Sequence, residues 1–304
     1  MLRGILPRQD LPFGNHRYHF VRPKVLAISG SAISVKNDLE TRRLQTVQIN
    51  ISVEDPTSDD GRGSVSVGWF FLEGTNAKVI YDSPKRVRTS DRSAPHAKSA
   101  SRCPAVLNFE SRLFEIKCPV DVAVSFVRGE DGQAELHAAG GPQSSIRRNR
   151  LAQLVHLSDE AEWRHPDRPV LQLALPYVFV ADAPVVINQL APFLHYRAEA
   201  LPGTMFAGRF PIHVWPRPIM WSFEWHDTDK PLVIKRGEPL FYVQFETIPQ
   251  ERPVQLVEAE LTPELQAYLD LISGTVDYVS QTFSLMQAAA DQRPAQLVSP
   301  KRRK

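Results

Sequence analysis

The sequence predicts a mainly β protein, a jelly roll or β-sandwich, followed by a C-terminal amphipathic helix. Two observations support this fold class. The chain contains 25 prolines in 304 residues, and proline lacks the amide hydrogen that a helix interior needs. Between 169 and 246, short apolar segments alternate with Pro/Gly turns, a pattern typical of sandwiches and barrels. Only after 262 does the apolar spacing change to that of a helix.

We divide the chain into four parts. Residues 1–150 form an N-terminal β-rich region with polar loops, 151–260 the sandwich or jelly-roll core, 261–291 the C-terminal helix and 292–304 a basic tail. Residues 83–102 are basic and rich in Ser and Pro, so we expect an exposed or disordered loop there. We expect a short helix over 144–157. The expected strands are 44–53, 65–72, 77–81, the pair 113–116 and 120–126, then 170–175, 178–180, 185–190, 212–215, 219–225, 232–234 and 240–245.

The composition excludes several classes of protein. Lys and Arg total 36 against 34 for Asp and Glu, a balance that gives no reason to expect nucleic-acid binding. The sequence has no uninterrupted apolar run of about 18 residues, which argues against a membrane span. Residues 1–12 lack the apolar stretch of a signal peptide. We therefore expect a cytoplasmic or virion-associated protein.

The two cysteines, Cys103 and Cys118, are too few for a disulfide framework. The strand expected at 113–116 lies between them, so they could face each other across a hairpin. The alternative is a pair of buried thiols in a reducing compartment.

The end of the chain carries a helix start and a heptad pattern. Thr262 can cap a helix and Pro263 suits its first turn. The apolar stripe that follows can dock on the chain's own sheet, or it can mediate self-association along the face from Leu265 to Ala290. The basic tail from Arg293 is expected to be disordered. The stripe, spaced by four and three residues in turn, is Leu265, Leu269, Ile272, Val276, Val279, Phe283, Met286 and Ala290.

Residues 202–246 open on Pro202-Gly203 and Phe206-Ala207-Gly208. They close with an apolar strand, the turn Lys235-Arg236-Gly237-Glu238-Pro239 and a last apolar strand. This segment resembles the closing hairpin of β-clip proteins of the dUTPase and dCTP deaminase type, and it is similar to an uncharacterised bacterial β-domain family. The resemblance implies a β-clip-like barrel as the alternative fold. That family also has an acidic residue after Pro-Gly and an Arg-Ser phosphate-binding element. Here Thr204 and Met205 follow Gly203 and no Arg-Ser element matches, so only the fold is carried over.

A metal centre is one candidate site. His213 and His226 lie in adjacent expected strands, and Glu224 shares a strand face with His226. Two histidines and a carboxylate form the ligand set of non-haem iron enzymes, so the cofactor would be a divalent metal such as Fe. His195 is a fourth possible ligand. The alternative is that these histidines are hydrogen-bonded packing residues.

An aromatic and basic patch is the other candidate site. Rings interleaved with a guanidinium suit a base, a sugar or a proline-rich peptide. Tryptophans at alternating positions of one strand can equally form the core of a sheet; in 221–226, Trp221, Phe223 and Trp225 would face one way and Ser222, Glu224 and His226 the other. The patch consists of Trp215, Arg217, Trp221, Trp225 and Tyr242.

Nucleophile-elbow, Walker A, dinucleotide-binding and zincin motifs are all absent from the sequence. Whether the chain is an enzyme therefore stays open. The function we expect is that of a non-catalytic, homo-oligomeric assembly or interaction protein, including a phage-like structural protein. The alternatives are a cupin-like jelly-roll enzyme with a non-haem metal and a nucleotide-binding β-clip trimer.

Overall fold

A computed structural model describes residues 63–72, 79–88, 99–138, 144–247, 252–273 and 282–301. The chain divides into two units, Met1–Ser52 and Val53–Lys304, and all described residues belong to the second. The strand expected at 44–53 lies outside the described residues, as do Val276 and Val279 of the apolar stripe.

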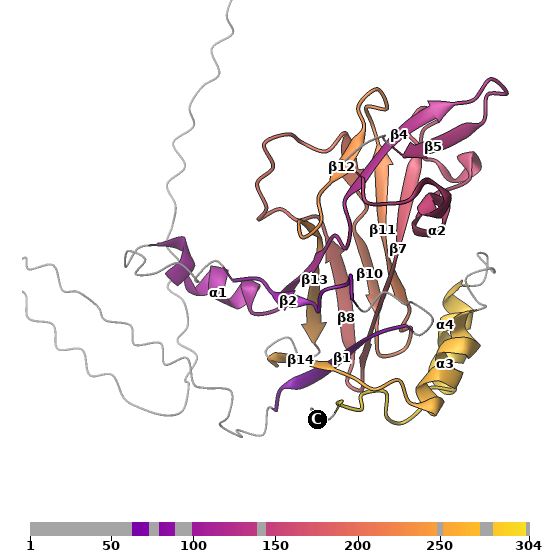
Figure 1. The fold of residues 1–304 in the computed structure, drawn as a ribbon. Helices are drawn as coiled ribbons and strands as arrows, with labels where there is room; N and C mark the ends of the chain where they lie inside the picture. Colours follow the sequence, from indigo (N-terminus) through magenta and orange to yellow (C-terminus); the bar gives the residue numbers. More distant parts are fainter. Residues whose placement is uncertain are drawn as a thin grey trace, which may run out of the picture. The chain divides into compact units, whose positions relative to one another are not determined.

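The described strands form three sheets (Figure 1). The first sheet has the order β14 (Val254–Glu258), β1 (Val65–Phe71), β7 (Val170–Ala181), β11 (Pro218–Trp225) and β9 (Gly203–Met205), with β6 (Val155–Leu157) also paired to β7. The second has the order β10 (Gly208–Pro211), β8 (Val185–Leu190), β13 (Pro239–Thr247), β3 (Leu113–Lys117) and β2 (Lys85–Arg86). The third has the order β12 (Leu232–Ile234), β4 (Val122–Arg128) and β5 (Ala134–Ala138).

The helices are short and lie outside these sheets. Because the described strands exceed the helices in length and close into no barrel, the mainly β, sandwich-like prediction is confirmed. The described helical segments are η1 (Ala100–Arg102), α1 (Pro104–Glu110), η2 (Arg148–Arg150), α2 (Leu151–Leu154), η3 (Glu160–Glu162), α3 (Pro263–Ser273) and α4 (Thr282–Asp291). None of them is long and apolar enough to cross a membrane.

The main core lies between the first and second sheets. The rings of Phe179 on β7 and Phe245 on β13 meet with centroids 5.4 Å apart. Trp221 and Phe223 of β11 stack with centroids 5.2 Å apart on the same inner face. Each large ring removed from water contributes a few kcal/mol to folding. The alternation predicted for 221–226 is therefore confirmed, and its aromatic face is sheet core.

Strand β7 runs through Pro176 without interruption, although the sequence suggested two separate strands on either side of it. Its pairing register with β11 shifts between Pro218 and Met220, which pair with Val178 and Ala174. Pro176 therefore lies at the irregularity, where its missing amide hydrogen breaks no ladder bond. The Pro176 carbonyl accepts a hydrogen bond from the Leu72 amide at 2.8 Å.

The strands expected to pair at 113–116 and 120–126 do not pair with each other. Strand β3 pairs with β13 and β2, whereas β4 pairs with β12 and β5. The turn after Cys118 thus carries the chain from the second sheet to the third. Cys118 is buried and Cys103, which precedes α1, is exposed, and both are free thiols. They do not face each other across a hairpin.

The turn at 235–239 also joins two sheets, because β12 pairs with β4 and β13 with β3 and β8. The expected closing hairpin is therefore a crossing between sheets, at which Gly237 adopts a φ of 84°. A positive φ of this size favours glycine. Residues 212–214 and 79–80 form turns rather than strands, and 144–157 contains the short α2 followed by β6.

Helix α3 begins where the sequence predicts, with the Leu265 amide donating to the Thr262 hydroxyl at 3.2 Å. The described part of α3 runs to Ser273, and α4 is described from Thr282. The described part of the apolar stripe packs on the outer face of the chain's own first sheet. This is the first of the two alternatives, docking on the chain's own sheet. The cluster includes Leu265, Leu269 and Ile272 of α3, Ala289 of α4, and Phe70, Val178, Val180 and Trp215.

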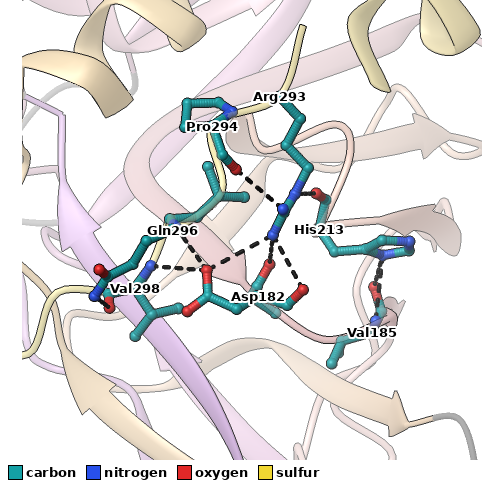
Figure 2. Close-up of polar contacts among 9 residues, drawn as sticks. Asp182, Val185, His213, Arg293, Pro294, Gln296 and Val298 are labelled. Carbon is teal, nitrogen blue, oxygen red and sulfur yellow. Dashed lines mark hydrogen bonds and ion pairs between the residues drawn. The ribbon is translucent and has the colours of Figure 1, made fainter. Parts of the chain in front are cut away.

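Residues 292–301 of the C-terminal segment are ordered, although its basic composition suggested a disordered tail. Ala259 and Pro300 form a β-bridge, and Leu297 and Val298 are buried in the cluster beneath α3 and α4. Figure 2 shows why: Arg293 donates to the carbonyl oxygen of His213 at 2.5 Å. This partly buried contact explains how a basic segment can hold a fixed place.

Candidate functional site

A pocket of about 760 Å³, here called the α3 pocket, lies between the outer face of the first sheet and helix α3. Ala174, Met220 and Ser222 of β7 and β11 are among the sheet residues that line it, and Leu269 and Ile272 line it from α3. Ala174 pairs directly with Met220, and the small alanine side chain leaves space above the strand.

The segment between β10 and β11 supplies another wall of the α3 pocket, through Trp215, Pro216 and Arg217. The Trp215 amide donates to the Pro211 carbonyl at 2.8 Å, which closes a tight turn. Tyr268 of α3 donates its hydroxyl to the Val214 carbonyl at 2.6 Å, so the wall is attached to the helix. Burial raises the pKa of Tyr268 and keeps it a donor.

The polar groups of the α3 pocket are few. Arg217 is its one basic lining residue, and its guanidinium carbon lies 5.0 Å from the centre of the Phe210 ring. Arg217 is exposed to solvent, and the burial of part of its side chain lowers the pKa of its guanidinium. Gln172 and Ser222 are cross-strand neighbours. Asp270, the one acidic lining residue, accepts a hydrogen bond from the side-chain amide of Gln266 at 2.7 Å.

The structure separates the residues of the predicted aromatic patch. Trp215 and Arg217 line the α3 pocket. Trp221 and Trp225 are 2% and 0% exposed in the main core, so these two rings offer no face to a ligand. Tyr242 is also buried and meets the Phe193 ring edge-on with centroids 5.4 Å apart; burial raises its pKa to about 12. Trp221, Trp225 and Tyr242 are therefore core residues, as the alternative to a binding patch expected of tryptophans in one strand.

The predicted metal ligands are brought together only in part. His226 Nε2 lies 2.9 Å from Glu224 Oε2. However, His213 follows β10 of the second sheet, not a strand adjacent to β11, and its Nδ1 contacts the Val185 backbone (Figure 2). His195 lies in the loop after β8. Within the described ranges, no three His, Cys, Asp or Glu side chains gather as a metal-ligand group.

Glu224 instead belongs to an ion-pair cluster at the edge of the first sheet. Arg164 holds its carboxylate with two hydrogen bonds, Nε to Oε1 at 3.1 Å and Nη2 to Oε2 at 2.8 Å. These bonds, and then the contact with His226, hold the pKa of Glu224 below its usual value. The Arg164 guanidinium also lies 4.6 Å from the centre of the Phe206 ring. Both glutamate oxygens are thus already occupied by the chain's own cations.

An exposed apolar surface, here called the α1 surface, was missed by the sequence analysis. It combines helix α1 with the loop after β8, where the rings of Phe109 and Phe193 lie 5.9 Å apart. Arg197 fixes the loop by donating to Glu238 Oε2 and to the Val233 carbonyl, both at 2.8 Å. Its exposed members are Leu107 (39%), Phe109 (39%), Phe193 (55%), Leu194 (45%) and Tyr196 (88%). The sequence signal was the uncharged run 104–109.

Two hollows flank helix α1 on this surface. One, of about 370 Å³, is lined by Ala105, Val106 and Leu194 among others. The other, of about 510 Å³, lies between α1 and the end of β13, and polar or charged residues, among them Asn108, Arg112 and Glu246, form much of its lining. Protruding apolar side chains and hollows of side-chain size therefore occur next to each other.

Searches for similarity to protein-family models, to curated proteins and to solved structures found no match for this chain. Its function is therefore inferred from its own geometry.

Proposed function

We propose that the chain is a non-catalytic assembly protein that associates with further copies of itself through the α1 surface. The observation that carries this proposal is that α1 exposes its apolar side chains, among them Leu107 and Phe109, although an apolar helix of seven residues has little stability by itself. A second copy covering this surface would remove those side chains from water, which favours association by about 25 cal/mol per Å² of apolar area.

The charge distribution supports the same interpretation. The one ionisable residue within α1, Glu110, is buried, so the exposed part of the helix carries no charge. Charged residues are depleted at the centres of protein interfaces, and aromatic residues are enriched there. The formal net charge of the whole chain is only +2, so copies do not repel one another strongly.

The shape of the α1 surface favours a second copy as the occupant. In a two-fold interface the same surface must supply both the protruding groups and the hollows that receive them. Here Leu107, Phe109 and Phe193 are exposed, and Ala105 and Phe109 of the same helix line both hollows. One copy can place its α1 side chains beside α1 of the other.

The surface that we propose differs from the face that the sequence suggested for self-association. In the α3 and α4 region, Leu265 is fully buried and Leu269 and Ile272 are nearly so, all against the chain's own first sheet. Association through these side chains would require them to leave that sheet. The α1 surface needs no such rearrangement.

The test is the molar mass of the full-length chain by light scattering at tens of micromolar. We expect an oligomer for the wild type, monomers for Leu107→Ser and for Phe193→Ser, and an unchanged oligomer for Val127→Ser. Val127 is a matched control because it is 38% exposed on β4, outside the α1 surface. Circular dichroism establishes that each variant is folded. A monomeric wild type, or oligomers that survive both substitutions, would overturn the proposal.

A further inference from the structure

We propose that the α3 pocket binds a small carboxylic acid with an apolar body, with Arg217 as the residue that receives the carboxylate. This site is separate from the α1 surface and does not depend on self-association. Its lining residues come chiefly from β7, β10, β11, α3 and the segments that flank β10.

The apolar body is inferred from the walls of the pocket. Trp215 and Phe210 come from the segment around the turn after β10, Leu269 and Ile272 from α3, and Met220 from the sheet. Met220 is 40% exposed, so an apolar ligand would remove apolar surface from water on both partners. A volume of about 760 Å³ falls in the range of about 300–1,000 Å³ that is usual for small-molecule sites.

The carboxylate is inferred from Arg217. No described carboxylate lies within 4.0 Å of its guanidinium, and no hydrogen bond to the guanidinium is found in the described part of the chain. The Phe210 ring lies against it, and burial already lowers its pKa. A carboxylate gains most from a guanidinium that is partly removed from water, because two parallel hydrogen bonds can form at lower dielectric. Arg217 therefore favours an acid over an alcohol or an amine.

Asp270 is the group in the α3 pocket that would favour a cationic ligand instead. Its hydrogen bonds therefore bear on whether the pocket prefers a negative or a positive ligand. Its Oδ1 already accepts a hydrogen bond from Gln266, one turn earlier on α3. Arg217 has no comparable partner among the described residues. The available charge in the pocket is therefore positive.

The first sheet, which forms the floor of the α3 pocket, offers a second polar contact. Ser222 and Gln172 face each other across β11 and β7, and both line the pocket. Pro218, next to Arg217, and Ser222 are four residues apart on β11, which corresponds to roughly 13 Å along a strand. A hydroxyl at the far end of an extended carboxylic acid could reach this pair while the carboxylate stays at Arg217.

The experiment compares octanoate, 8-hydroxyoctanoate, 1-octanol and octylammonium, titrated separately into the full-length chain below their aggregation concentrations and followed by calorimetry or NMR. We expect octanoate to bind about tenfold more tightly than 1-octanol, the gain typical of a charge-assisted hydrogen bond. Octylammonium should bind more weakly than either. The terminal hydroxyl of 8-hydroxyoctanoate should increase affinity further.

Four variants serve to locate the site. Arg217→Gln should remove the preference for octanoate and leave the affinity for 1-octanol unchanged. Arg209→Gln is the matched control, because Arg209 is an exposed arginine on nearby β10 that pairs with Glu246 instead of lining the α3 pocket. Ala174→Leu should fill the floor and abolish binding of every probe, and Ser222→Leu serves the same purpose if that variant does not fold.

Four outcomes would overturn the proposal. They are no binding of any probe, equal affinities for octanoate and 1-octanol, tighter binding of octylammonium than of octanoate, and a preference for octanoate that survives Arg217→Gln.

Discussion

Arg293 and Asp182 hold the C-terminal segment to the turn between β7 and β8. The Arg293 guanidinium donates from Nη2 to the backbone carbonyl of Asp182 at 3.0 Å, and Asp182 Oδ1 accepts the Leu297 amide at 2.5 Å (Figure 2). Each residue thus binds the backbone around the other. A guanidinium has five donors, and Arg293 also uses them on the carbonyls of Ala181 and His213.

We expect Asp182→Ala to lower the free energy of unfolding by about 2 kcal/mol, because the Leu297 and Val298 amides would lose their shared acceptor. Urea unfolding measures the change. Asp167→Ala is the control, since Asp167 is exposed and its contact with His165 is 4.0 Å long; we expect a change within about 0.5 kcal/mol. Equal midpoints for the Asp182→Ala variant and the wild type would show that the contact adds nothing to stability.

Leu265→Ala should lower stability without changing the molar mass. The Leu265 side chain is fully buried between α3 and the first sheet, and truncating a leucine in such a site costs about 3 kcal/mol. Leu271→Ala is the matched control, because Leu271 is on the same helix and 47% exposed. Unfolding and light scattering on the same samples separate the two effects. A lower mass with unchanged stability would favour self-association through α3.

The parts of the fold that depend on neighbouring residues could be predicted from the sequence. The alternation through Trp221 and Phe223 required only that one face of β11 be buried. The start of α3 at Thr262 and Pro263 required only capping chemistry. Both features depend only on residues a few positions away in the sequence, so tertiary contacts did not override them.

Strand partners and the ordered segment 292–301 depend on distant residues, and the sequence did not reveal them. Strand β1 pairs in parallel with β14, whose residue Val254 lies opposite Val65. Arg293 appears in a basic, solvated segment, yet its guanidinium meets the backbone of His213, 80 positions earlier. The binding surfaces also depend on distant residues. The sequence identified Arg217 as a basic residue among aromatic ones, but the pocket beside it exists only because α3 docks there.

Gly203→Ala should be strongly destabilising, by about 3 kcal/mol. A Cβ at this position would lie 2.0 Å from the Glu224 carbonyl oxygen and 2.9 Å from the Trp225 Cα, so β9 could not keep its pairing with β11. Gly208→Ala is the matched control, because the nearest atom to a Cβ there is 3.8 Å away. Thermal unfolding compares the two variants. Equal melting temperatures would mean that β9 can shift at little cost.

The ion pair of Glu224 should make stability depend on pH in the acid range. Because Arg164 lowers the pKa of the folded carboxyl below the ordinary 4.5, the unfolded chain binds the proton more readily. The stabilisation is therefore complete at neutral pH and is lost as the pH falls below 4.5 through the lowered folded value. We expect the stability difference between the wild type and Glu224→Gln to shrink over that range.

The control for the glutamate experiment is Glu160→Gln. Glu160 pairs with Arg128 at 2.7 Å, but both side chains are more than 40% exposed, and such pairs contribute less than about 1 kcal/mol. Urea unfolding at a series of pH values measures both variants. A difference for Glu224→Gln that is constant from neutral to acid pH would contradict the ion-pair explanation.

The two cysteines should react with a thiol reagent at very different rates. Cys103 is exposed ahead of α1, whereas Cys118 is buried and burial raises the pKa of its thiol to about 12. The thiolate is the reactive form, so at neutral pH Cys118 lacks both access and charge. We expect one thiol to be modified in the native chain and a second only after denaturation. Cys103→Ser should show no rapid modification, and two rapid reactions in the native wild type would contradict the buried position of Cys118.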